Sequence, residues 1–87
     1  MAVTVELTYD MGKELGLSSF ELDDVRTVAD VMRAARQRFG EKAASFDQLG
    51  SRAAVAVNGV LTNHRRGMRT ELADGDIVTF VKAAAGG

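Results

Sequence analysis

The sequence predicts an α+β fold in which one main helix packs across one face of a mixed sheet of four or five strands. Three observations predict it: alternating apolar and polar residues near both ends of the chain, one amphipathic segment with helical spacing, and an Asn-Gly pair typical of a hairpin. The 87 residues suffice for one small domain. A content of 46% hydrophobic and 26% charged residues indicates that this domain is globular.

The first part of the chain is expected to contain two strands and the turn between them. Residues 2–9 alternate apolar and polar side chains, which predicts a half-buried strand. Residues 10–19 carry Gly12 and Gly16 and are expected to form a turn or loop. A second short strand is predicted over residues 20–25, antiparallel to the first if the loop is a hairpin.

The main helix is predicted over residues 28–39. Thr27 is a suitable N-cap, because its hydroxyl can accept a hydrogen bond from a free N–H of the first turn, and Asp30 adds negative charge near the positive end of the helix dipole. Gly40 is a suitable stop. Apolar residues recur with helical spacing on the face expected to pack on the sheet: Val28, Val31, Met32, Ala35 and Phe39.

The second half of the chain is expected to complete the sheet. Residues 41–52 have no regular pattern and are expected to be irregular, with Phe46 and Leu49 packed underneath. Asn58-Gly59 is the strongest hairpin signal, because both residues tolerate a positive φ. The other elements are a strand over residues 53–57, a short return strand at residues 60–61, a basic loop over residues 62–69, a tight turn at residues 74–76 and a last strand over residues 77–81. The first and last strands are expected to pair in parallel at the centre of the sheet.

Composition excludes several function classes. The chain has no cysteine, which excludes disulfides, thiolate zinc sites and a thiol nucleophile. The formal net charge of -1 argues against a general nucleic-acid binder. No apolar run approaches the roughly 18 residues of a transmembrane helix, and the N-terminus lacks a signal-peptide pattern. A cytoplasmic protein with neither a nucleic-acid nor a membrane partner is therefore expected.

Motifs for catalysis or metal binding are absent from the sequence, so no catalytic residue and no metal ligand is predicted. His64 is the only histidine and is expected to be a solvated loop residue, and Asp74 and Asp76 provide too few carboxylates for calcium. Three arginines of the basic loop are either solvated or form an edge that docks an acidic partner or a phosphate. They are Arg65, Arg66 and Arg69.

The end of the chain has the most informative pattern. Residues 1–81 are expected to form the domain, and residues 82–87 a flexible tail that ends in Gly86-Gly87. Two residues without Cβ can enter a slot too narrow for any side chain, and six residues beyond the last strand reach about 20 Å when extended. The carboxylate of Gly87 can therefore enter the active site of another protein. A free carboxylate becomes a useful acyl donor when a partner adenylates it.

Three segments carry a specific resemblance: residues 54–61 (AVAVNGVL), residues 72–81 (LADGDIVTFV) and the final Gly86-Gly87. In order and spacing they resemble the MoaD/ThiS family of small sulfur carriers, including its MoaD-like and CysO-like members, which have the ubiquitin-like β-grasp fold. The first half of the chain matches that fold by the order of its elements alone.

The resemblance implies a mechanism in which this chain is a carrier rather than an enzyme, or the small subunit of a synthase. An adenylating enzyme of the ThiF/MoeB type would consume ATP and form an acyl-adenylate on Gly87, with Gly86, Ala85 and Ala84 as the slender tail. A sulfur donor would then produce a thiocarboxylate, and a biosynthetic enzyme would accept the sulfur for molybdopterin, cysteine, thiamin or another metabolite. No bound cofactor is implied. With no cysteine, the sulfur has no side chain to occupy.

The resemblance also implies a docking face of exposed apolar residues on the sheet, at Leu61 and Val81, and Ile77 is added because it alternates in step with Val81 on the same strand. Strand alternation places Val81 outward, and Thr8 stands where relatives often have an aromatic residue. Relatives also carry prolines before the final glycines, and this chain has none. Two alternatives remain open: a protein modifier joined through Gly87 to lysines of its targets, and a non-covalent binding module with an incidental tail.

Overall fold

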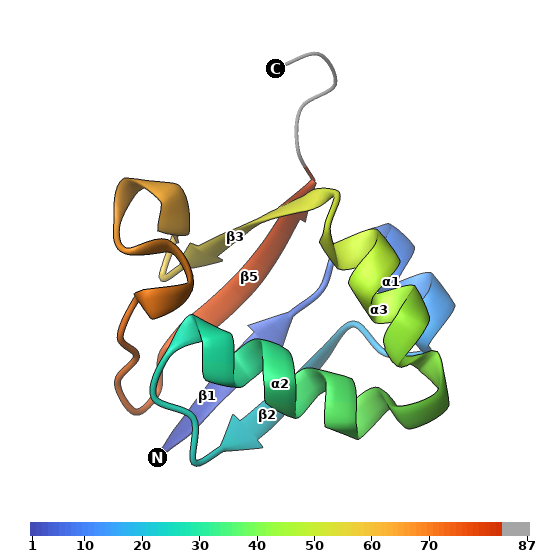
Figure 1. Ribbon diagram of the computed structural model, residues 1–87, viewed down its shortest axis with the longest axis horizontal. Helices are drawn as coiled ribbons and strands as arrows, with labels where there is room; N and C mark the ends of the chain where they lie inside the picture. The colour runs from blue at the N-terminus through green and yellow to red at the C-terminus, as the bar shows by residue number, and fades with distance from the viewer. Residues whose placement is uncertain (83–87) are drawn as a thin grey trace.

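A computed structural model describes residues 1–82 of the chain (Figure 1). Five strands form one mixed sheet and the longest helix packs across it, which confirms the predicted fold class. The elements are β1 (Ala2–Glu6), α1 (Tyr9–Leu15), β2 (Ser19–Asp23), α2 (Val28–Phe39), η1 (Gly40–Lys42), α3 (Ala43–Gly50), β3 (Ala53–Val57), β4 (Val60–Leu61), η2 (Thr62–His64), η3 (Gly67–Arg69) and β5 (Ile77–Lys82), where η marks a 3-10 turn.

The first and last strands lie side by side inside the sheet, whose order is β2-β1-β5-β3-β4. β1 pairs antiparallel with β2 and parallel with β5, as predicted from the crossover through the helix. β5 is the middle strand and pairs antiparallel with β3 on its other side. Figure 1 shows α2 lying across the sheet, and α1 and α3 beside each other at the end where β5 finishes.

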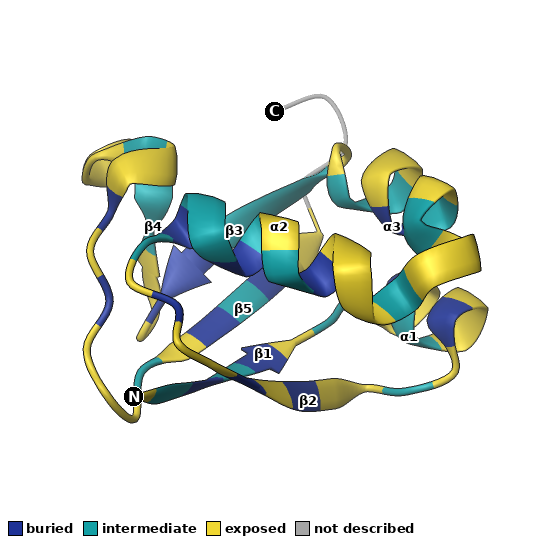
Figure 2. Cartoon of the chain, turned by 60° about the horizontal axis from the view of Figure 1, so that its bottom comes forward, coloured by how far each residue is buried: buried dark blue, intermediate teal, exposed yellow. Residues whose placement is uncertain are grey.

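The hydrophobic core lies between the sheet and the helices. A row of four phenylalanine rings joins β2, α2, α3 and β5, with centroids 5.3 Å apart from Phe20 to Phe39, 5.4 Å from Phe39 to Phe46 and 5.6 Å from Phe46 to Phe80. Two of these contacts are edge-to-face, a geometry that adds about 0.5–1.5 kcal/mol to the burial of each pair. Figure 2 shows buried and exposed residues alternating along β2, as a one-sided core requires.

The prediction of a turn or loop over residues 10–19 is wrong, because α1 occupies the first half of that segment. Thr8 is the N-cap of this helix, and its Oγ1 accepts a hydrogen bond from the backbone N–H of Met11 at 3.1 Å. Met11 and Leu15, four residues apart, are buried on the inner side. Burial of these two side chains outweighs the low helix propensity of the segment.

Two glycines made the segment of α1 look like a turn. Gly12 lies inside the helix, where an added Cβ would stand 2.9 Å from the carbonyl oxygen of Leu17. Gly16 follows the last turn with a φ of 86°, a left-handed conformation that ends many helices. One glycine is therefore required by close packing and the other by the C-cap, and neither marks a loop.

The prediction that residues 41–52 are irregular is also wrong, since this segment contains α3. Lys42 stands at the N-cap of α3 without a side-chain cap hydrogen bond, so the sequence offers no start signal there. Phe46 is buried and Leu49 half-buried, as predicted. The helix depends on packing against α1, α2 and β3 rather than on local propensity.

Three strands differ from the prediction at their ends. β1 ends at Glu6 rather than at residue 9, and β2 begins at Ser19 rather than at residue 20. β2 ends at Asp23 because Asp24 has a φ of 59°, which no strand residue adopts. β5 continues through Lys82, which pairs with Ala53, one residue beyond the predicted end of the last strand. Residues 83–87 lie outside the described part of the chain.

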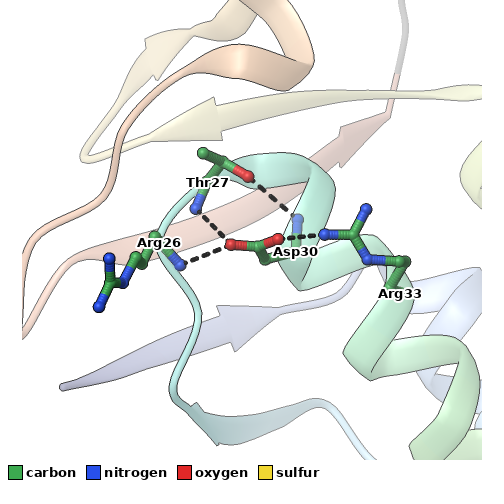
Figure 3. Close-up of polar contacts among 4 residues, drawn as sticks. All are labelled: Arg26, Thr27, Asp30 and Arg33. Atoms are coloured by element: carbon green, nitrogen blue, oxygen red, sulfur yellow. Dashed lines mark hydrogen bonds and ion pairs between the residues drawn. The ribbon is translucent and has the colours of Figure 1, made fainter.

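The main helix α2 begins and ends where predicted. Figure 3 shows its capping box: Thr27 Oγ1 accepts from the backbone N–H of Asp30 at 3.2 Å, and Asp30 Oδ2 accepts from the N–H of Thr27 at 3.2 Å. Asp30 also accepts from the N–H of Arg26 at 2.9 Å and pairs with the Arg33 guanidinium. The hydrogen bond from Arg26, aided by those from Thr27 and by Arg33, lowers the pKa of the Asp30 carboxyl from its ordinary value.

This cap makes a testable contribution to acid stability. A carboxyl whose pKa is lower in the folded state stabilises the fold above its ordinary pKa of 3.8, and the contribution is lost as pH falls through the lower folded value. We expect Asp30→Asn to lower the free energy of unfolding at pH 7, and this difference from the native chain to shrink progressively below about pH 4. Urea unfolding of both proteins between pH 7 and pH 2 measures it.

Asp23→Asn is the matched control for this experiment, because Asp23 is an exposed carboxylate at the end of β2. Asp23→Asn should change the free energy of unfolding little at any pH between 7 and 2. A destabilisation by Asp30→Asn that stays constant over the whole pH range would contradict the role assigned to the Asp30 charge.

Candidate functional site

The sheet face opposite α2 is the candidate site. Along β5, Val78 and Phe80 are buried on the helix side, whereas Ile77 and Val81 are 41% and 37% exposed on the other. The pairing of β3 with β4 places Leu61 opposite Ala56, which itself pairs with Thr79 of β5. The three predicted docking residues, Leu61, Ile77 and Val81, therefore share one face. We call this surface the open face.

The centre of the open face is polar and its flanks are apolar. Thr79 donates a hydrogen bond from its Oγ1 to Glu6 Oε1 at 3.1 Å, across the parallel pair of strands. Ala54 pairs with Val81, so a small apolar residue extends the patch over β3. Leu61 is half-buried rather than exposed. The exposed apolar side chains, rather than the polar centre, make this face a candidate protein-docking surface.

Tyr9 is the residue that the sequence analysis missed. The alternating pattern assigned it to a buried strand, but β1 ends at Glu6 and Tyr9 begins α1 with 81% of its surface exposed. Tyr9 shares a surface hollow of about 330 Å³ with Val81 and Lys82, the last described residues of β5. An exposed aromatic ring therefore stands beside the point where the chain leaves the sheet. Recognition of Thr8 as an N-cap would have revealed it.

Thr8 itself does not occupy the position predicted for it. It was expected on the first strand as a light docking contact, but it lies beyond β1 and its hydroxyl caps α1. Its side chain is therefore committed to the start of the helix, and the adjacent Tyr9 provides the aromatic surface.

The three predicted arginines are all exposed and lie in the segment of η2 and η3, at the β4 edge of the sheet. None of them forms an ion pair with any residue between 1 and 82. Arg65 lies close enough to Asp76 to contribute to the lowering of its pKa.

A hydrogen-bonded pair at the start of β5 sets the geometry of the open face. Asn58 has a φ of 49° in the β3–β4 hairpin, and its Nδ2 donates to Asp76 Oδ1 at 2.9 Å. Asn58 Oδ1 accepts from the N–H of Ile77 at 2.9 Å, and the N–H of Ala73 donates to Asp76 Oδ2 at 2.8 Å. The bonds from Ala73 and Asn58, with the nearby Arg65 guanidinium, hold the pKa of Asp76 below its ordinary value.

The remaining sequence predictions concern metals, membranes and the tail. Within residues 1–82 there is no group of three or more His, Cys, Asp or Glu side chains that could hold a metal, and His64 is exposed in η2. None of the described helices is both long and apolar enough to cross a bilayer. The predicted modified residue Gly87 and the predicted tail, Ala84, Ala85 and Gly86, lie outside the described residues.

The mixed sheet, the crossing helix and the open face define the chain as a small ubiquitin-like β-grasp protein, a fold that it shares with several solved structures. The family model described as "ThiS family" matches residues 13–87, and the chain belongs to the ThiS family. A search of curated proteins found no significant match.

Three of the similar solved structures come from different organisms. Small archaeal modifier protein 1 from Methanosarcina acetivorans is 21% identical, with a TM-score of 0.79 over 99% of this chain and 96% of that one. A chain of the Amycolatopsis orientalis BexX/CysO complex is 26% identical, with a TM-score of 0.76 over 98% and 99%. A chain of the complex of subunits 1 and 2 of molybdopterin-converting factor from Helicobacter pylori is 21% identical, with a TM-score of 0.66 over 100% of both.

The Asn58–Asp76 pair can be tested by stability. Asn58→Gly retains the positive φ but loses the bonds to Asp76 and Ile77, so we expect a loss of about 1–2 kcal/mol. Asn58→Asp should cost more at pH 7, because it places a second carboxylate against Asp76. Urea unfolding measures both, with Asn63→Gly in η2 as the control. Equal stabilities of native chain and Asn58→Gly would contradict this role.

Proposed function

We propose that this chain is a sulfur carrier whose Gly87 carboxylate is activated by adenylation and converted to a thiocarboxylate. The observation that carries the proposal is the Gly86-Gly87 pair, which three residues separate from the central strand of a ThiS-family β-grasp domain. The similarity to the CysO complex and to molybdopterin-converting factor supports a role in sulfur transfer. The acceptor would be a biosynthetic enzyme for cysteine, molybdopterin, thiamin or another sulfur-containing metabolite.

The proposed chemistry takes place in the active site of a partner. An adenylating enzyme of the ThiF/MoeB type binds ATP, and the Gly87 carboxylate attacks the α-phosphorus and releases pyrophosphate. Sulfide then displaces AMP, so one carboxylate oxygen leaves with the AMP and sulfur takes its place. This chain supplies the docking surface and the slender carboxylate, and the partner supplies the catalytic groups. The chain therefore acts as a co-substrate rather than as an enzyme.

The open face is proposed as the surface that holds the adenylating enzyme. Ile77 and Val81 contribute exposed apolar area on β5, and Tyr9 adds an aromatic ring at the end where the chain leaves the sheet. Burial of such area contributes about 25 cal/mol for each Å² removed from water. Contacts at this end of the sheet would also orient the residues after Lys82 toward the partner's active site.

The proposal predicts a defined change in mass. Incubation of the native chain with its adenylating partner, ATP and sulfide should raise its intact mass by the difference between one sulfur and one oxygen atom. The chain that lacks Gly86-Gly87 should gain nothing. A verified partner that adenylates no carboxylate of the native chain would overturn the proposal.

Conjugation is the second candidate function, supported by the similarity to a protein described as a small archaeal modifier protein. It begins with the same acyl-adenylate but ends in an amide bond to a lysine of a target. Covalent adducts in cells that disappear when Gly86-Gly87 is deleted would favour conjugation over sulfur transfer. A non-covalent binding module, in contrast, would function equally well without the two glycines.

Tyr9 gives a specific test of the docking surface. Because 81% of its surface is exposed, Tyr9→Ala should leave stability nearly unchanged but raise the KM of the adenylating enzyme about tenfold, as loss of an interface aromatic residue does. Val60→Ala is the control, since Val60 is an exposed apolar residue on the helix side of the β3–β4 pair. Steady-state pyrophosphate release measures both. Equal KM values for Tyr9→Ala and the native chain would exclude Tyr9 from the interface.

A further inference from the structure

The outer border of β2 is an unpaired strand edge. In the sheet order β2-β1-β5-β3-β4, β2 has a hydrogen-bonded neighbour on one side only, and Figure 2 shows it at the border of the sheet with no described element beyond it. The strand at the other border, β4, has two residues and continues into η2, so it offers little backbone. An exposed strand edge presents free N–H and C=O groups with which another chain can pair. We call the border of β2 the β2 edge.

The pairing with β1 determines which backbone groups lie on the β2 edge. The N–H of Leu7 donates to the carbonyl of Ser18 at 2.9 Å. At the other end, the N–H of Asp24 donates to the carbonyl of Met1 at 3.0 Å. Hydrogen-bonded pairs alternate with non-bonded pairs in an antiparallel ladder, so the even-numbered residues of β2 bond to β1. The N–H and C=O groups of the odd-numbered residues therefore point outward, and within residues 1–82 they pair with no other strand. These residues are Ser19, Glu21 and Asp23.

The side chains on the outward residues of the β2 edge are acidic. Glu21 and Asp23 are exposed, and neither forms an ion pair with any residue between 1 and 82. Their partners on β1 belong to the same set of alternate residues as Glu6, which is exposed on the open face. Residues 1–24 contain six Asp and Glu against one Lys. The described part of the chain therefore leaves the negative charge along this border without a paired cation.

The helix side of β2 is already packed and carries a cation. Phe20 and Leu22 are buried there, and the Arg38 guanidinium lies 5.1 Å from the centre of the Phe20 ring. This packing holds β2 extended before any partner binds, which lowers the conformational entropy lost on binding. The two sides of the β2 edge therefore favour different residues in an added strand: basic residues beside Glu21 and Asp23, and uncharged residues beside Arg38.

We propose that the β2 edge binds an extended segment of a partner protein in which lysine or arginine alternates with uncharged residues. The segment adds a strand to the sheet. Its backbone bonds to the free N–H and C=O groups of β2, and its basic side chains pair with Glu21 and Asp23 by charge complementarity. A second copy of this chain fits worse, because pairing of two β2 edges would set these carboxylates against like charges.

The β2 edge and the apolar part of the open face can be occupied at the same time. β1 separates β2 from β5, so an added strand leaves Ile77 and Val81 uncovered. The chain would join a protein that carries a basic extended segment to whatever protein holds its open face. This inference does not depend on the chemistry at Gly87.

The test uses the isotope-labelled full chain and a capped synthetic peptide in which lysine alternates with threonine. In an NMR titration the amide signals of Ser19, Glu21 and Asp23 should shift and their hydrogen exchange should slow, because strand addition pairs these N–H groups. The affinity should fall as salt rises. Glu21→Lys should weaken binding about fivefold or more, whereas Glu41→Lys, an equal charge change on η1, is the control and should leave binding nearly unchanged.

Two N-methylated forms of the peptide separate strand addition from simple charge attraction. Only alternate N–H groups of an added strand face its neighbour, so methylation of one alternate set should abolish binding. Methylation of the other set should retain it. The two peptides carry the same charge, and the comparison uses the native chain, so it does not depend on the folding of any variant.

Several results would overturn the proposal. They are unchanged exchange of the three outward amides at millimolar peptide, shifts centred on Ile77 and Val81, equal binding of the two methylated peptides, equal binding of a peptide with glutamate in place of lysine, or equal weakening by Glu41→Lys and Glu21→Lys. A dimer of the unliganded chain in which the outward amides are protected from exchange would assign the β2 edge to a second copy instead. Because Glu21 is exposed, Glu21→Lys is compatible with folding, and its thermal unfolding checks this directly.

Discussion

The hydrogen-bonded pair of Asn58 and Asp76 controls the geometry of the molecule because it sets the register of β5, the middle strand. Side chains alternate along a strand with a period of two, so a slip of one residue would reverse the two faces of β5. In the observed register Val78 and Phe80 complete the core, and Ile77 and Val81 face outward. The same register places the end of β5, at Lys82, beside Tyr9.

One pair of strands serves two surfaces with different chemistry. β3 and β5 contribute Ala54 and Val81 to the open face, and Val55 and Phe80 to the wall of an apolar hollow on the helix side of the sheet. The open face lies beside the end of β5 and the aromatic ring of Tyr9, whereas the hollow has a mostly apolar wall that includes Met32 and Met68. A sheet covered by helices on one side provides this division, because each strand presents alternate residues to opposite sides.

Elements with strong local signals were predicted from the sequence. The Asn58-Gly59 hairpin has positive φ at both residues, and α2 begins at its capping box. The two shorter helices were missed for a physical reason: α1 tolerates Gly12 because a side chain there would collide with the backbone of Leu17, and α3 begins without a cap. Their stability comes from contacts with residues distant in sequence, which a reading of propensities does not detect.

By itself, the sequence determined the kind of fold and the central pairing of the first and last strands. It also indicated the ThiS family, to which the chain belongs, and it contains the Gly86-Gly87 pair on which the proposed chemistry rests. Alternation also predicted that Val81 faces outward. Only the tertiary structure decided that Tyr9 is exposed and that Met68 opens onto a hollow. These properties depend on which elements pack against each residue, and packing is decided by the whole chain rather than by neighbours in sequence.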